Sequence, residues 1–217
     1  MLEVKEYYNS LAATYDNERF DNSYGKFIDT EERKILADWL KGIDKSGILD
    51  YGCGTGRLTD FANAGIDISE QMLEVARQKH PAKKFSLLHD HSIENNSLNA
   101  VYSFHVIMHL QQKDFDEVID FIHSKLANNG IFIFDVLSSF RKSKKEGWHA
   151  NTSYSIDEIK NQIECKFEVI TYTGILFLPI HRIPASLRKY FLWLDQFLCN
   201  GFLKKYSSYY CIYAKKK

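Results

Sequence analysis

Apolar and polar positions along the middle of the chain follow two patterns. Short runs that are almost entirely apolar, such as residues 47–51 (GILDY) and 131–137 (IFIFDVL), alternate with longer stretches. Those stretches, such as residues 70–80 and 114–130, carry apolar residues every three or four positions. The first pattern is typical of buried strands and the second of amphipathic helices. Together they predict an α/β fold, with a parallel sheet covered by helices on both faces.

The two ends of the chain differ from this middle part. Residues 29–42 show apolar positions at helical spacing and finish with Gly42, which predicts a helical cap before the first strand. At the other end, the pattern predicts a strand at residues 166–180, a helix at residues 185–206 and a last strand, rich in tyrosine, at residues 207–217. The polar stretch at residues 138–155 is left open as a linker, a lid or a surface loop.

A glycine-rich loop follows the first predicted strand. In residues 48–58 (ILDYGCGTGRL), an apolar run ends with an acid, and glycine then stands at Gly52, Gly54 and Gly56. Such a loop lies at the carboxyl edge of a parallel sheet, where a backbone without side chains can approach a ligand. A dinucleotide fingerprint would be GxGxxG, but Arg57 stands where its third glycine would be, which disfavours a nicotinamide cofactor. A tight turn without a ligand is the alternative.

The loop resembles motif I of the class I S-adenosylmethionine-dependent methyltransferases, in the form of the small-molecule, ubiquinone/menaquinone-methyltransferase-like branch. The resemblance covers nearly the whole chain. Segments resembling the family's N-terminal, second, third and fourth motifs follow in order at residues 7–16 (YYNSLAATYD), 65–73 (GIDISEQML), 89–90 (HD) and 103–110 (SFHVIMHL).

This resemblance implies a Rossmann-like three-layer sandwich with a seven-stranded, mostly parallel sheet and an antiparallel last strand. It also implies one domain, residues 1–217. This domain would consist of a helical N-terminal cap (residues 1–45), a cofactor-binding core (residues 46–137) and a C-terminal part with acceptor-pocket elements (residues 138–217). The implied activity is in-line transfer of a methyl group to a small molecule, which releases S-adenosylhomocysteine.

The resemblance further implies S-adenosyl-L-methionine as the cofactor and a set of residues around it. The methionine end would be held by Asp50 and by the loop residues Gly52, Cys53, Gly54 and Gly56. Around the ribose and adenine would lie Asp67, Ile68 and Met72, and the adenine edge would be contacted by Asp90 and His91. Phe104 would contact the cofactor from the fourth strand, and Tyr15 would close over it. Tyr15 has an alternative as ordinary cap core, and Asp67 as a turn acid before a helix. Only ten residues separate Gly56 from Asp67, so we expect a first helix of one or two turns and a very short second strand.

Two histidines are the candidates for catalysis. His105 and His109 stand four positions apart after the fourth strand, near the place where the methyl group should emerge. A histidine of near-neutral pKa can remove a proton from the acceptor, and His109 is the first candidate for this base. Histidines that only pack and form hydrogen bonds are the alternative. No carboxylate cluster or HExxH motif accompanies them, so no metal is expected.

The predicted C-terminal helix is the candidate source of the acceptor pocket. One helical stripe, for which core packing is the simplest interpretation, consists of Leu187, Tyr190, Phe191, Leu194, Phe197 and Leu198. Leu192 and Trp193 fall on another face. That face is left open as a pocket wall, a homodimer contact or a surface for a lipid-like substrate.

Composition narrows the partners and the location. The chain has 28 basic residues (Lys and Arg) and 28 acidic residues (Asp and Glu), so its net charge does not attract nucleic acid. It also lacks the pair of adjacent prolines found in the loop of enzymes of this fold that methylate bases. Nucleic acid is therefore not an expected partner. The four cysteines form no CxxC pair, the N-terminus has no apolar signal-peptide core, and no run could span a membrane. We therefore expect a cytoplasmic enzyme. A non-catalytic protein that binds the cofactor in a regulatory or scaffold role, and a nicotinamide oxidoreductase, are the rivals.

Overall fold

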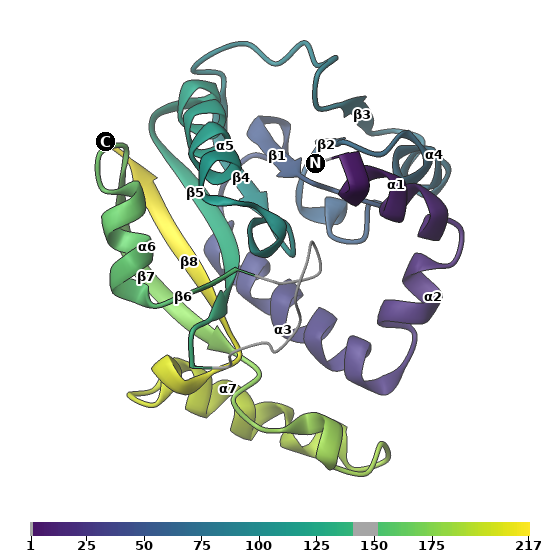
Figure 1. Cartoon of the computed structure of the whole chain (residues 1–217), viewed down its shortest axis with the longest axis vertical. Helices are drawn as coiled ribbons and strands as arrows, with labels where there is room; N and C mark the ends of the chain where they lie inside the picture. The colour runs from purple at the N-terminus through teal and green to yellow at the C-terminus, as the bar shows by residue number, and fades with distance from the viewer. Residues whose placement is uncertain (1, 141–151) are drawn as a thin grey trace.

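The computed structural model of the chain describes residues 2–140 and 152–217. Its centre is one sheet with the strand order β3-β2-β1-β4-β5-β8-β7, in which β8 runs antiparallel to both of its neighbours and the other pairs are parallel (Figure 1). The strands are β1 (Ile48–Tyr51), β2 (Ala64–Asp67), β3 (Lys84–Leu87), β4 (Leu98–Ser103), β5 (Leu126–Ser138), β7 (Phe167–Ile175) and β8 (Tyr209–Lys216). All seven predicted strands and the antiparallel last strand are confirmed. A two-residue strand, β6 (Ser153–Tyr154), pairs with the end of β5.

Helices cover both faces of this sheet. They are α1 (Leu2–Leu11), α2 (Tyr15–Phe20), α3 (Ser23–Trp39), α4 (Glu70–Lys79), α5 (Gln112–Lys125), α6 (Ile156–Ile163) and α7 (Leu192–Asn200). Alternate residues of β5 serve the two faces: Phe132 and Phe134 join the core under α5 and α6, whereas Ile133 joins the core under α3. This is the period-two geometry of a strand buried on both sides.

The short connection after the glycine loop has the predicted form. Between Gly56 and Asp67 the chain makes one turn of 3-10 helix, Thr59–Phe61, and then the four-residue strand β2. The backbone N–H of Lys84 donates to the carbonyl of Asn63, which extends the pairing beyond β2. A helix of normal length is therefore absent here because the chain is too short to hold one.

Several other boundaries differ from the predictions. Helix α5 ends at Lys125, and the following five residues start β5 instead of completing the helix. Helix α6 was not predicted, although Ser155 and Glu158 form a capping box at its start. Of the predicted polar stretch, residues 141–151 lie outside the described residues.

The predicted helix at residues 185–206 is wrong in its length and in its buried face. It consists of a 3-10 turn (Arg188–Phe191), α7, and a second 3-10 turn (Lys204–Tyr206). Core packing of the stripe is also wrong, because Leu187, Tyr190 and Phe197 are exposed, and Phe191, Leu194 and Leu198 are only half-buried. The side of α7 that faces the protein carries Asp195 and Cys199 instead.

Within the part of the chain that is described, no helix has both the length and the apolar composition needed to cross a bilayer.

The contact between α3 and the sheet should be a main source of stability. Leu36 is fully buried in the core under α3, so Leu36→Ala should lower the free energy of unfolding by about 2–5 kcal/mol through lost burial and a residual cavity. Urea unfolding followed by circular dichroism measures this. Asp38→Ala, an exposed change on the same helix, should shift it by less than about 0.5 kcal/mol. Equal effects of the two variants would contradict the docking of α3.

Candidate functional site

The glycine loop leaves β1 through backbone conformations that favour glycine. Gly52 has φ +72° and Gly54 has φ +52°, both in the left-handed region. A Cβ on Gly52 would lie 2.3 Å from Val106 Cγ2, whereas a Cβ on Gly54 would meet nothing within 4 Å. Gly52 is therefore required by packing against the turn after β4, while Gly54 faces open space where a ligand can approach.

Backbone hydrogen bonds fix the loop to the end of β2. The N–H groups of Gly52 and Cys53 donate to the carbonyl of Ile66 at 2.8 and 3.0 Å. The N–H of Gly54 donates to Asp67 Oδ2 at 2.9 Å, and the N–H of Ser69 donates to Asp67 Oδ1 at 2.9 Å. The carboxylate of Asp67 thus holds together the loop and the start of α4, where Ser69 caps the helix.

A cavity of about 340 Å³ opens beside this loop. Its walls come from the loop, the end of β2, helices α1, α2 and α5, and the turn after β4. The predicted site residues that line it are Tyr15, Asp50, Gly52, Cys53, Gly54, Asp67, Ile68, Met72, His91, Phe104, His105 and His109. Residues that are 94 positions apart in the chain, from Tyr15 to His109, therefore meet at one site of a size typical for small ligands.

Two predicted cofactor residues lie outside this lining. The carbonyl of Gly56 accepts a hydrogen bond from the His80 ring at 2.9 Å and borders a second cavity on the outer side of the loop. Asp90 is exposed, and its N–H donates to the carbonyl of Leu87 at 3.0 Å. Its neighbour His91 does line the cavity and packs against Phe121, with ring centroids 5.1 Å apart.

The cavity also contains residues that were not assigned to the site from the sequence. Tyr8 and Phe20 reach it from the cap, and Glu117 and Phe121 reach it from α5. Tyr8 lies in the N-terminal motif beside Tyr15, so the motif was a usable signal for it. The residues of α5 show only the apolar spacing of any packed helix, which carries no such signal.

Tyr8 makes the contact that joins the cap to the catalytic candidate. Its hydroxyl lies 3.1 Å from Nε2 of His109, and its ring packs edge-on against Tyr15 with centroids 5.9 Å apart. Burial raises the pKa of Tyr8, so its hydroxyl keeps its proton and can act as a donor.

A group of charged side chains forms part of the cavity wall, where Arg57 and His105 line the cavity and Glu32 and Asp135 are buried next to them. His105 Nε2 is 2.6 Å from Glu32 Oε1, and its Nδ1 is 3.6 Å from Asp135 Oδ2. Arg57 Nη2 is 2.7 Å from Glu32 Oε2, and its guanidinium lies over the ring of Phe20, 3.9 Å from the centroid. We call Glu32, Arg57, His105 and Asp135 the buried charge cluster.

Contacts within the cluster oppose the effect of burial on the pKa values of its members. Burial alone would lower the pKa of His105, but attraction to Glu32 and Asp135 outweighs this and raises it. Burial alone would raise the pKa of Glu32, but Arg57 and His105 lower it to about 2. The two acids therefore favour the protonated form of His105, and its backbone, at φ +60°, is held by the N–H that donates to Asp135 Oδ1 at 2.6 Å.

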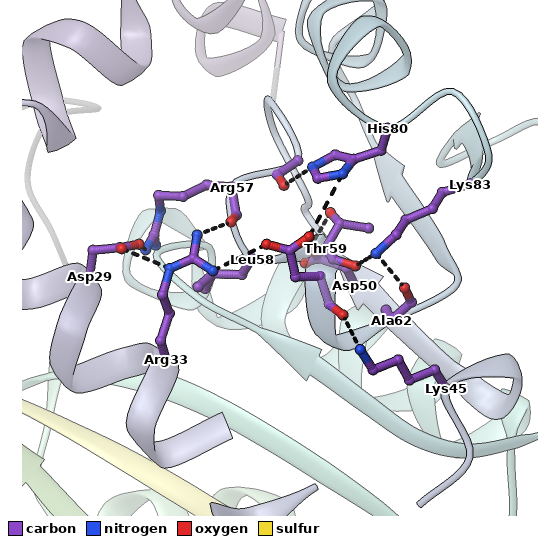
Figure 2. Close-up of polar contacts among 12 residues, drawn as sticks. Asp29, Arg33, Lys45, Asp50, Arg57, Leu58, Thr59, Ala62, His80 and Lys83 are labelled. Atoms are coloured by element: carbon purple, nitrogen blue, oxygen red, sulfur yellow. Dashed lines mark hydrogen bonds and ion pairs between the residues drawn. The ribbon is translucent and has the colours of Figure 1, made fainter. Parts of the chain in front are cut away.

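The segment that follows the glycine loop is held from its outer side, as Figure 2 shows. Asp29 accepts from Arg57 Nη1 at 2.6 Å and from Arg33 Nε at 2.7 Å, and Arg33 Nη2 donates to the carbonyl of Arg57. Lys83 donates to the carbonyls of Thr59 and Ala62. These contacts fix the loop between the cap and the sheet.

Asp50 lies beneath the loop and is buried. Its Oδ2 accepts from Thr59 Oγ1 at 2.7 Å, a contact that is also visible in Figure 2. Burial raises the pKa of Asp50 to about 7, against the opposing effect of the bond from Thr59. This carboxyl therefore supports the loop from below and titrates near neutral pH.

Comparison with known proteins agrees with this geometry. Residues 49–134 match the family described as "Methyltransferase domain". An uncharacterized protein from Methanocaldococcus jannaschii is 27% identical over 98% of this chain and 90% of its own length. Magnesium protoporphyrin IX methyltransferase from Synechocystis, crystallised with S-adenosylhomocysteine, has a TM-score of 0.66 at 16% identity, covering 100% of this chain and 99% of its own. A Thermotoga maritima protein described as a possible histamine N-methyltransferase has a TM-score of 0.65 at 16% identity, covering 92% and 97%.

Residues 49–134, which include the glycine loop, match a methyltransferase domain, and the sheet has the fold of the S-adenosylmethionine-dependent methyltransferases among its structural neighbours. The cofactor of this chain is S-adenosylmethionine. The residues present fit this molecule, because the open space at Gly54 lies in a cavity that has the backbone of the glycine loop, the carboxyl of Asp67 and apolar side chains such as Ile68 and Met72 in its walls.

A side chain at position 54 should block cofactor binding without unfolding the protein. Gly54→Val should eliminate binding of S-adenosylhomocysteine in isothermal titration calorimetry, because the new side chain would occupy the cavity. Gly42→Val is the matched control, since Gly42 also has a positive φ (+83°) and no atom within 4 Å of the point where a Cβ would lie, but is away from the cavity. Both variants should lose about 1–3 kcal/mol of stability from backbone strain. Unchanged affinity in Gly54→Val would contradict the placement.

Asp50 should make stability depend on pH. Its folded pKa lies above its unfolded value, so the stabilisation is fully present below about pH 4 and is lost as pH rises through about 7. Wild type should therefore lose free energy of unfolding relative to Asp50→Asn between these limits, on the order of 2–4 kcal/mol. Urea unfolding at several pH values measures this. Asp38→Asn, an exposed control, should follow wild type, and parallel curves for wild type and Asp50→Asn would refute the assignment.

Proposed function

We propose that this methyltransferase acts on a small molecule that binds in the cavity between the cap and the sheet. The observation that carries the proposal is the cover formed by Tyr8, Tyr15 and Phe20, which come from α1 and α2 and line the same cavity as the glycine loop. An acceptor must therefore fit under the cap next to the cofactor. Two structural neighbours are described with small acceptors, a porphyrin and, as a possibility, histamine.

The cofactor-binding role of the lining residues is part of this proposal. When bound, S-adenosylmethionine supplies an electrophilic methyl group on a sulfonium. The loop from Gly52 to Gly54 would support its methionine end, and Asp67 and Met72 would lie around its ribose and adenine. Asp67 already accepts from two backbone N–H groups, and its carboxylate has lone pairs left for a ribose hydroxyl. Gly56 and Asp90 do not line the cavity, so their contribution to cofactor binding would be to hold the backbone of the glycine loop and of the segment before His91 in place.

The proton of the acceptor would leave through Tyr8 and His109. When His109 carries its proton on Nδ1, the Tyr8 hydroxyl can donate to Nε2, and it can then accept the acceptor's proton while passing its own to the imidazole. His105 is less suited to this step, because both of its ring nitrogens face carboxyls, Nε2 at 2.6 Å from Glu32 and Nδ1 at 3.6 Å from Asp135. We therefore assign His105 to positioning the turn after β4 and His109 to proton removal.

The walls favour an acceptor that is apolar or aromatic. Tyr15, Phe20 and Phe121 present rings to the cavity, and the charges beside them are paired within the buried charge cluster. An anionic acceptor would in addition face the carboxyls of Asp67, Asp114 and Glu117, which line the same cavity. The resemblance of the motifs to the ubiquinone/menaquinone-type branch supports the same class of acceptor, a small molecule with a ring and an ionisable proton.

The acceptor class and the proton relay can be tested together. Tritiated S-adenosylmethionine should label the dialysable fraction of a cell extract and leave the retained macromolecules unlabelled. With the labelled acceptor, His109→Gln and Tyr8→Phe should lower kcat by about 10²–10⁴-fold, the usual contribution of general base catalysis, and the loss should shrink at high pH. Affinity for S-adenosylhomocysteine should stay unchanged.

The control for this experiment is His181→Gln, because His181 is exposed and does not line the cavity. It should keep the wild-type rate. Label confined to macromolecules would refute the small-molecule acceptor. An unchanged rate in both His109→Gln and Tyr8→Phe would remove the relay while leaving the acceptor class standing.

A further inference from the structure

The segment between β7 and β8 leaves large apolar side chains in solvent. We call residues 176–208, all of which are described, the β7–β8 arm. Six of the eight large apolar side chains that are exposed in the described residues belong to it: Leu187, Tyr190, Trp193, Phe197, Phe202 and Tyr206. The exposed fractions of Trp193, Phe197 and Phe202 are 68, 70 and 89%. Such a concentration on one segment marks an interaction surface.

Helix α7 is held so that its aromatic side faces outward. Asp195, on its inner side, is fully buried and accepts from the N–H of Leu178 at 2.5 Å and from the N–H of Phe177 at 3.3 Å. Trp193 and Phe197 lie one turn apart on the opposite side. Their exposure therefore follows from the polar contacts of the inner side and not from a loose helix.

The arm also carries a positive charge that the whole chain lacks. Between residues 179 and 208 there are five Lys or Arg residues and one carboxylate, the buried Asp195, whereas the total formal charge of the chain is zero. The exposed Lys189 and Lys205 each hold their ammonium 5.0 Å from the centroid of the next residue's ring, Tyr190 and Tyr206. Exposed lysines and aromatic rings thus lie next to each other both before and after α7 in the arm.

We propose that the β7–β8 arm binds the surface of an anionic lipid bilayer. Trp, Tyr and Phe are favoured at the level of the lipid headgroups, and lysines beside them are attracted to lipid phosphates. A protein partner fits less well, because Lys is depleted in the buried centre of protein interfaces and here it lies beside the rings. Helix α7 lies at the lower end of the molecule in Figure 1, and no residue of the arm lines the cavity, so a bound membrane leaves the cavity accessible.

Vesicle flotation tests this proposal. Wild type should float with vesicles of phosphatidylcholine and phosphatidylglycerol, bind pure phosphatidylcholine weakly, and lose binding as salt is added. The variant Trp193→Ser/Phe197→Ser/Phe202→Ser should lower the partition coefficient at least about tenfold. The variant Lys189→Glu/Lys205→Glu should lower it about tenfold or more on anionic vesicles only. The matched controls are Ile170→Ser, exposed outside the arm, and Lys41→Glu/Lys84→Glu.

All variants should keep the wild-type circular dichroism spectrum and affinity for S-adenosylhomocysteine, because the changed side chains are exposed and lie off the cavity. The test is thus independent of the proposed function. Absence of wild-type flotation with anionic vesicles would overturn the proposal, as would equal losses in the controls. A dimer seen by light scattering without lipid, and abolished by the triple serine change, would assign the surface to a second copy of the chain instead.

Discussion

The buried charge cluster joins the three parts of the molecule that surround the cavity. Glu32 belongs to the cap helix α3, Arg57 follows the glycine loop, and His105 stands on the turn after β4. Each of these charges alone would be costly to bury, and only their mutual contacts make the arrangement stable. The cap is therefore fixed to the sheet by ion pairs that centre on the buried carboxylate of Glu32. This leaves the space in front of them open for ligands.

The two glycines at the start of the loop meet different physical demands. Gly52 is constrained from inside the protein by Val106, and Gly54 is constrained only by its backbone conformation and by what occupies the cavity. One motif thus serves both folding and binding. Asp67 links the two demands, because the same carboxylate that orders the Gly54 amide also orders the start of α4.

The sequence was sufficient for the parts of the structure that depend on neighbouring residues. The strands and the shortened segment between Gly56 and Asp67 could be predicted, because apolar runs and glycine spacing are local signals. Twelve of the fourteen predicted site residues also line the cavity, because the motifs that contain them are short stretches of neighbouring residues. The contact of Tyr8 with His109 could not, since it joins residues 101 positions apart. The burial of Asp195 was equally hidden, because its partners are backbone N–H groups of another segment that no side-chain pattern reveals.

The position of β8 determines the order in which the sheet can be completed. This strand comes last in the sequence, yet it lies between β5 and β7 and pairs with both. During synthesis β7 has no neighbour in the sheet until β8 emerges. Until then, the edge of β5 that will pair with β8 and the backbone of β7 have unpaired N–H and C=O groups. Assembly of this half therefore waits until β8 has been synthesised, and until then the nascent chain carries open strand edges that favour aggregation.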